Sequence, residues 1–304
     1  MGKSSNIGGQ AVIEGVMMRS GDQYAVAVRK PDQEIEVKVE DYKSFIKHKK
    51  LTTIPIIRGA FNFIDSMVVG MKTLTYSASF YEDEEEVKEK EKPKSEKQEK
   101  VIMGFTVAFS LLISIGMFMI LPYFIASFLR RFTDSYAIIA IAEAVIRMVI
   151  FIGYIVLISF MKDIKRLFRY HGAEHKCINC IETGHPLTVE NVMKSSKQHK
   201  RCGTSFLLIV VFITAILFMF IKVDSPVLRV VIRLLLIPVI AGISYEFIRL
   251  AGRSDNKLVN ILSKPGMWMQ NLTTKEPDER MVEVAIASVE AVFDWEKYLA
   301  DNKG

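Results

Sequence analysis

The residues best suited to chemistry lie in one short segment that contains two histidines and a glutamate. Residues 170–176 are YHGAEHK, so His171, Glu174 and His175 follow an H-x-x-E-H pattern. On an α-helix this spacing places the two imidazoles one turn apart, where both can bind one metal ion. In the inverted zincin motif, which has the same spacing, the glutamate is the general base of a metal-assisted hydrolysis. We therefore expect a divalent cation, preferably zinc, with His171 and His175 as ligands and Glu174 as catalytic base.

A third ligand is required, and two side chains are expected near the same place. His199 lies four residues before an apolar segment, and Glu246 lies near the end of another. An acidic residue costs about 2.5–3.5 kcal/mol at the centre of a membrane span, so Glu246 needs a partner. That partner is either the metal or Arg249, about one helical turn further on. His199 is the preferred third ligand.

Two other interpretations of this loop remain open. Cys177, Cys180, His199 and Cys202 form a C-x2-C pair and an H-x2-C pair separated by 18 residues. This spacing is compatible with a closed structural zinc site, which has no open position for substrate. Alternatively, residues 162–169 begin a basic helix at the membrane surface, and its histidines bind nothing.

Glu14 is a second acidic candidate. It lies in residues 8–19, GGQAVIEGVMMR, which lack the G-x4-G-K-[ST] spacing of a phosphate-binding loop. Glu14 is either a further catalytic group or part of the polar side of a strand. The surrounding glycines are typical of close backbone approach.

The elements that must position these residues begin with strands. In residues 34–40 polar and apolar residues alternate strictly, which places Ile35, Val37 and Val39 on one face. With residues 23–29 and the turn between them, this segment predicts a hairpin with one solvated face. Residues 55–80 instead have the pattern of an amphipathic helix at the bilayer surface.

Four apolar segments are long enough to cross a membrane. They cover residues 101–129, 137–161, 203–221 and 227–250, each near the roughly 20 residues that the hydrocarbon layer requires. The first contains no charged residue. The sequence thus predicts an α-helical polytopic membrane protein with four transmembrane helices and a small β-rich N-terminal cytoplasmic region, and it excludes a purely soluble protein. Glu143, Arg147 and Arg233 lie inside spans and are expected to form an ion-pair lock between helices.

The loop between the second and third spans indicates the orientation. Residues 162–202 contain nine Lys or Arg and four Asp or Glu. Because cytoplasmic loops carry such a surplus, we place this loop and both termini in the cytoplasm. The basic excess of the chain lies mostly in this loop, so no nucleic-acid partner is expected. The expected regions are 1–54 (β-rich), 55–80 (interfacial helix), 81–100 (charged linker), 101–161 (two spans), 162–202 (loop with the H-x-x-E-H helix), 203–250 (two spans) and 251–304 (C-terminal amphipathic helix).

Several sequence blocks, in order, resemble a known family. The blocks are residues 9–19 (GQAVIEGVMMR), 58–59 (RG), 171–176 (HGAEHK), 201–206 (RCGTSF), 244–246 (SYE) and 276–278 (EPD). They are similar to those of the domain of unknown function 1385 (DUF1385, YqhQ-like) family, bacterial membrane proteins described as metal-dependent enzymes. The resemblance covers most of the chain and implies a location in the bacterial plasma membrane, but it implies no substrate. It favours His199 and Glu14, because members have His-Pro-Arg-Cys at residues 199–202 and the cysteine pair at 177 and 180 is not part of the pattern.

Two functions follow from these patterns. The first is a metal-dependent hydrolase with its site at the cytoplasmic membrane surface, where the substrate is a peptide or a lipid-linked headgroup. Its metal ligands come from His171, His175, His199 and Glu246, and its catalytic residues are Glu174 and Glu14. The second is a non-catalytic factor that binds other membrane proteins, for example during their biogenesis. Its docking surfaces would be the N-terminal strands and an amphipathic helix over residues 278–299. The apolar stripe of that helix fits core packing equally well.

Overall fold

A computed structural model describes residues 4–44, 53–81, 96–220, 223, 225–252, 254 and 256–302. The chain divides into two units. Unit 1 comprises Met1–Tyr81, Val156–Ile209 and Ala241–Gly304, and unit 2 comprises Glu82–Ile155 and Val210–Ile240. Most of the expected charged linker lies outside the described residues, and helix α3 begins at Glu96.

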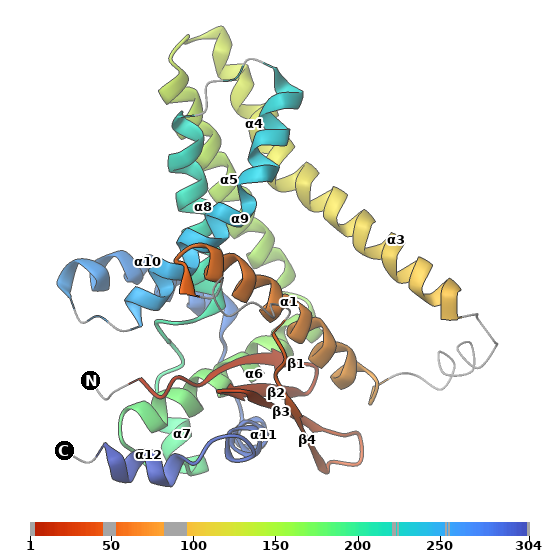
Figure 1. Cartoon of the computed structure of the whole chain (residues 1–304), viewed down its shortest axis with the longest axis vertical. Coiled ribbons are helices and arrows are strands. Elements are labelled where there is room, and N and C mark those ends of the chain that lie inside the picture. Colours follow the sequence, from red (N-terminus) through yellow and green to blue (C-terminus); the bar gives the residue numbers. More distant parts are fainter. Residues whose placement is uncertain are drawn as a thin grey trace. The chain divides into compact units, whose positions relative to one another are not determined.

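Unit 1 contains a four-stranded antiparallel sheet in which each strand pairs with the next along the chain (Figure 1). Its strands are β1 (Gly8–Val12), β2 (Gly15–Ser20), β3 (Gln23–Arg29) and β4 (Ile35–Asp41). The predicted hairpin is confirmed as β3 and β4. Its alternating face is not buried as a whole, because β4 is an edge strand on which Val37 and Val39 remain 39% and 45% exposed.

Helices pack on both faces of the sheet. Helix α1 (Ile57–Ala78) contributes Val69 and Leu74 to the apolar cluster that contains Met17 and Val26. Helices α6 (Lys162–Glu182) and α11 (Glu279–Glu290) pack around a second cluster, which contains Val16 and Met18. The central strands are therefore buried on both faces, which explains why the segments GVMM and YAVAV are almost continuously apolar.

The C-terminal region forms three helices where the sequence predicted one amphipathic helix. They are α10 (Lys257–Thr273), α11 and α12 (Trp295–Asp301). A further short helix, α7 (Val189–Lys194), lies outside this region, between α6 and α8. The side chains of Asp278 and Asp294 cap the starts of α11 and α12, so the predicted helix ends and restarts. The apolar stripe of α11 lies in the core, which explains it without a docking partner.

Among the described residues, four helices are long and apolar enough to cross a membrane, as predicted. The first, Gly104–Arg131, includes the end of α3 (Glu96–Ile115), a π-helical turn (Gly116–Ile120), α4 (Leu121–Ser127) and a 3-10 turn (Phe128–Arg131). The others are α5 (Tyr136–Ile158), α8 (Gly203–Phe220) and the Val230–Ala251 part of α9 (Pro226–Ala251). The expected apolar segments agree with these helices to within a few residues.

Buried charges connect the helices of unit 2. The Glu143 carboxylate lies 2.5 Å from a guanidinium nitrogen of Arg147 on the same helix and 2.6 Å from one of Arg233 on α9. The Nε of Arg147 also donates to the Phe118 carbonyl at 2.9 Å. Pro122, four residues after Phe118, has no N–H with which to make the usual helical bond to that carbonyl. The predicted ion-pair lock is therefore confirmed, and it includes a backbone group.

We predict that Glu143→Ala strongly destabilises the protein. Removing one partner of a buried ion pair leaves uncompensated charges and typically costs about 3–5 kcal/mol. Chemical unfolding of the purified full-length protein in detergent micelles should show a lower midpoint for this variant. Asp134→Asn, which changes an exposed acid beside the same helix, is the control and should unfold like the wild type. Equal midpoints for Glu143→Ala and the wild type would show that the lock does not stabilise the bundle.

Candidate metal centre

Helix α6 brings His171 and His175 together with a cysteine from a distant segment. The two imidazole rings have centroids 4.4 Å apart, as expected for residues one turn apart. Cys202, the residue before α8, places its Sγ 3.3 Å from the Nε2 of His171. One potential ligand atom from each of the three residues lies within 4.8 Å of the others, and no other such group of three occurs among the described residues.

Backbone carbonyls fix the orientation of both imidazoles. The Nδ1 of His171 lies 2.9 Å from the Thr273 carbonyl oxygen, and the Nδ1 of His175 lies 2.6 Å from the Lys197 carbonyl oxygen. A carbonyl only accepts, so in each ring Nδ1 carries the proton and donates it, which leaves the Nε2 lone pair free. Metal-binding histidines are held in this way in most proteins. The two imidazoles and the thiol therefore fit a divalent cation.

Side chains of α6 also hold the loop that leads to Cys202. The Nζ of Lys176 donates to two carbonyls of residues 193–198, at 2.8 and 2.9 Å. The Nδ2 of Asn179 donates to two more, at 2.6 and 2.9 Å. Together with the bond from His175, these contacts fix the loop along the same helix that carries the histidines. They explain how a residue at position 202 reaches His171.

Gly172 permits the close approach that supplies the Thr273 carbonyl. A Cβ atom at this position would lie 2.0 Å from the Lys275 carbonyl oxygen, so a larger residue would push the segment after α10 away from α6. The Lys275 N–H donates to the Phe168 carbonyl at 2.9 Å. The glycine inside the H-x-x-E-H motif is therefore required by packing next to His171.

Glu174 is buried beside the cluster. Its residue is only 5% exposed, and strand β1 lies so close that a Cβ atom at Gly9 would be 2.9 Å from its Cγ. Its Oε2 has no hydrogen-bond partner among the described residues. Burial raises the pKa of the Glu174 carboxyl to about 7, against the opposing effect of His171. A carboxyl with such a pKa can both accept and release a proton at neutral pH.

His199, the preferred third ligand, lies near the cluster but outside the group of three. Its ring centroid is 5.8 Å from that of His175, and its Nε2 lies 3.4 Å from a carboxylate oxygen of Glu182. Burial lowers the pKa of His199, so its neutral form is favoured. Burial alone would raise the pKa of Glu182, but hydrogen bonds from His199 and Ser5 and the charge of Arg201 hold it at about 2.

The other two predicted acids pair with arginines. Glu246 of α9 accepts hydrogen bonds from Nε and a terminal nitrogen of Arg58 in α1, at 2.6 and 2.5 Å, and Arg249 is 3.9 Å away. Glu14, in the turn between β1 and β2, pairs with Arg166 of α6. Both carboxylates join distant elements, and neither belongs to the group of three.

The residues of the closed four-ligand alternative do not gather in one ligand group among the described residues. Cys177 lies in the apolar core, where burial raises the pKa of its thiol well above the usual value. The Sγ of Cys180 faces the carbonyls of His185 and Pro186, at 3.7 and 3.4 Å. The C-x2-C pair and Cys202 therefore do not form one group among the described residues.

The sequence prediction missed two contributors to the cluster. Cys202 was considered only within the closed site, although it lies in the RCGTSF block at the start of a span. Helix α10 was not predicted as a separate helix, and its Gln270 side chain exchanges hydrogen bonds with the His199 backbone at 2.8 and 2.7 Å. No pattern in the sequence indicates that contact, because it joins residues 71 positions apart.

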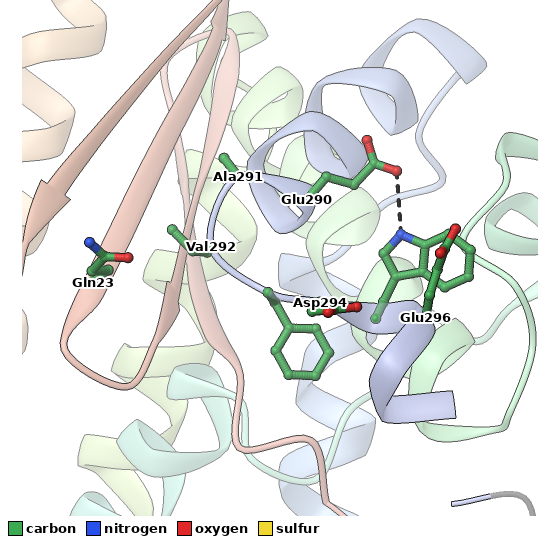
Figure 2. Close-up of a pocket in the computed structure, with 8 residues that line it drawn as sticks. Gln23, Glu290, Ala291, Val292, Asp294 and Glu296 are labelled. Carbon is green, nitrogen blue, oxygen red and sulfur yellow. Dashed lines mark hydrogen bonds between the residues drawn. The ribbon is translucent and has the colours of Figure 1, made fainter. Parts of the chain in front are cut away.

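A surface cavity of about 420 Å³ lies elsewhere in unit 1 (Figure 2). It is lined by Gln23 and by residues 290–296, where α11 ends and α12 begins. The Trp295 indole N–H donates to Glu290 at 3.4 Å in this cavity. None of the predicted catalytic or ligand residues lines this cavity. The cavity is therefore not part of the candidate metal centre, which is identified from the positions of its ligand atoms.

The fold and the cluster define a mostly helical protein with four helices able to span a membrane and with two histidines and a cysteine that could bind one cation. Residues 54–295 match the family model described as a protein of unknown function, DUF1385. Over 302 residues the chain is 37% identical to the uncharacterized protein YqhQ of Bacillus subtilis (strain 168), with 97% of this chain and 95% of the relative covered. The chain belongs to the DUF1385 family, as its sequence blocks predicted. No solved structure matches it.

We predict that Glu182 makes the protein sensitive to acid. Its pKa falls from an ordinary 4.5 to about 2 in the folded protein, so its contribution to stability is present above pH 4.5 and is lost as the pH falls toward 2. The free energy of unfolding should fall by an amount on the order of 3 kcal/mol when this contribution is lost completely. Chemical unfolding at about pH 5 and about pH 3 should show a smaller change for Glu182→Gln than for the wild type.

Glu190→Gln is the control for this experiment, because Glu190 is exposed and forms its ion pair with Lys194 one turn away. It should retain the pH dependence of the wild type. An equal loss of stability in Glu182→Gln and the wild type would show that other groups cause the acid sensitivity.

Proposed function

We propose that this chain is a membrane-bound, metal-dependent hydrolase whose protein ligands are His171, His175 and Cys202. The observation that supports this most directly is the pair of Nδ1 contacts to backbone carbonyls, which orient both imidazoles as ligands. The Cys202 sulfur beside them supplies a third donor of a type that zinc prefers. His199, Glu246 and Glu14 are assigned positioning roles instead, because each side chain is engaged in an ion pair or a contact with an acid.

Three protein ligands are typical of catalytic zinc sites, which keep a position open for water or substrate. A divalent cation bound there supplies a Lewis acid that polarises a substrate oxygen and acidifies water. Glu174 is the general base: its buried carboxylate accepts the proton of the attacking water and delivers it to the leaving group. His175 and Cys202 are buried and His171 is half-buried, so substrate approaches from the side of His171.

We place this site at the cytoplasmic surface of the bacterial plasma membrane, with both termini in the cytoplasm. Helix α6 begins four residues after the α5 span ends, and Cys202 directly precedes α8. The basic surplus of residues 162–202 supports the cytoplasmic side, and the similar protein YqhQ is bacterial. The substrate class is a peptide or a lipid-linked headgroup.

The amphipathic character of α1 supports the same location. Its buried positions include Asp65, Thr73 and Ser77, whereas Met67 and Val68 are 55% and 58% exposed. An outward apolar face on a helix near the ends of spans fits the bilayer surface.

We predict that the purified protein binds zinc stoichiometrically and that His171→Ala and Cys202→Ala abolish this binding. The protein is loaded with zinc, weakly bound metal is removed, and elemental analysis then measures the zinc content of the protein. Cobalt loading gives a second readout, because a thiolate ligand produces a charge-transfer absorption band that Cys202→Ala should remove. Cys177→Ala is the matched control, since it removes a buried thiol outside the group of three.

Loss of zinc in Cys177→Ala but not in His171→Ala would instead support a closed structural site. A wild-type protein that binds no metal under any loading condition would support the second function, a non-catalytic factor that binds other membrane proteins.

We predict that Glu174→Gln abolishes activity without loss of metal. The amide keeps the shape of the side chain but cannot accept the proton, and general-base catalysis contributes about 100-fold to 10,000-fold. Activity is measured by complementation of a deletion strain, under conditions in which that strain grows poorly. Elemental analysis of the same variant measures its zinc content. If Glu174→Gln restores growth fully while His171→Ala does not, the metal has a structural role and the hydrolase proposal fails.

A further inference from the structure

Most of the buried residues of helix α10 are polar or small, and its exposed residues include four large apolar side chains. Its buried residues are Ser263, Gly266, Met269, Gln270 and Thr273. Its exposed apolar residues are Leu258, Ile261, Leu262 and Trp268, with exposures of 64%, 58%, 48% and 62%. These four residues, called here the α10 stripe, lie within an arc of about 120° on the helix. A helix on a water-exposed surface has the reverse distribution.

The buried polar face is fixed by specific contacts. Gln270 donates to the Ser205 hydroxyl at 2.9 Å in addition to its bonds with the His199 backbone. The Thr273 hydroxyl donates to that of Thr204 at 3.1 Å. A Cβ atom at Gly266 would lie 2.8 Å from the Cβ of Ser205. Helix α10 cannot rotate to bury its stripe without breaking these contacts.

The position of α10 relates it to the ends of two spans within unit 1. It begins six residues after α9 ends at Ala251, and its buried face packs on the first turn of α8. The start of α8 and the end of α9 are adjacent. A Cβ atom at Gly252, just after α9, would lie 2.5 Å from the side chain of Arg201, just before α8. The helix therefore lies at the level where α8 begins and α9 ends.

We propose that the α10 stripe lies in the interfacial layer of the lipid bilayer. The proposal rests on the membrane embedding proposed above. Lipid is favoured as the occupant because the helix continues directly from a span end and because Trp268 is of a residue type enriched at membrane interfaces. The exposed Lys257 and Lys264 lie beside the stripe on the helix, where their charged ends can reach the headgroups.

This position ties the candidate metal centre to the bilayer. The last residue of α10, Thr273, supplies the carbonyl that orients His171. Helix α10 therefore connects the proposed lipid-facing stripe to the candidate metal centre through its C-terminal end. A lipid-linked headgroup is the substrate class that this connection favours.

The two tryptophans of the chain allow a direct test in the full-length protein. Trp295→Phe leaves Trp268 as the single fluorophore, and the matched control Trp268→Phe leaves Trp295, which lies outside α10. Both are reconstituted into vesicles of phosphatidylcholine and phosphatidylglycerol that carry bromine at a shallow or a deep position of the acyl chain. Iodide serves as the aqueous quencher.

We expect shallow bromines to reduce Trp268 emission more than deep bromines do, and iodide to reduce it weakly. Trp295 emission should respond to iodide and not to bromine. Trp268 emission that responds to iodide but not to bromine overturns the proposal. Emission insensitive to both also overturns it, because a protein surface, such as a second copy of the chain, then covers the stripe.

A third variant separates this proposal from the membrane embedding on which it rests. Leu112→Trp in a chain without Trp268 and Trp295 places a fluorophore in the first apolar helix, where the native side chain is 67% exposed. Strong quenching by deep bromines is expected there. If that variant responds and Trp268 does not, the α10 proposal alone fails. If neither responds, the membrane embedding fails as well.

Discussion

The candidate site depends on two backbone carbonyls that accept hydrogen bonds from imidazole rings. Without the carbonyls of Thr273 and Lys197, His171 and His175 would be free to rotate, and their Nε2 atoms would have no common direction. Neither carbonyl belongs to α6. The last residue of α10 supplies the first and the loop before α8 supplies the second, so the arrangement of the histidines requires most of unit 1 to be folded.

Helix α6 can serve this role because its faces make different contacts. One face buries Cys177 and Ile181 in the core with the sheet and α11, which fixes the helix in place. Lys176 and Asn179 bind the carbonyls of the loop that ends at Cys202. The ionisable side chains around the cluster are engaged by specific partners, whereas Glu174 keeps a buried carboxylate oxygen without a hydrogen-bond partner among the described residues. An uncompensated buried acid costs stability, and the proton-transfer role proposed for Glu174 would account for its retention.

Local patterns were sufficient to predict the strands, the four apolar helices and the H-x-x-E-H helix, because each is encoded by spacing within a short segment. The lock around Glu143 was also predictable, since charges inside apolar helices must find one another. Long-range partners were not predictable. Glu246 pairs with Arg58, 188 residues away, although the sequence suggested only a metal or Arg249. Helix α10 was not recognised as a separate helix, because residues 251–304 were assigned to one amphipathic helix and the breaks between α10, α11 and α12 were not predicted.

The central claim, that two imidazoles and one thiolate bind the same cation, is tested most directly by X-ray absorption at the zinc edge of the full-length protein. We expect the first coordination shell of zinc to contain one sulfur together with nitrogen or oxygen donors. The spectrum should also show the multiple-scattering signal of two imidazoles. The sulfur contribution should persist in Cys177→Ala, whereas Cys202→Ala should retain no bound zinc. A shell with several sulfurs, or one without imidazole scattering, would contradict the account.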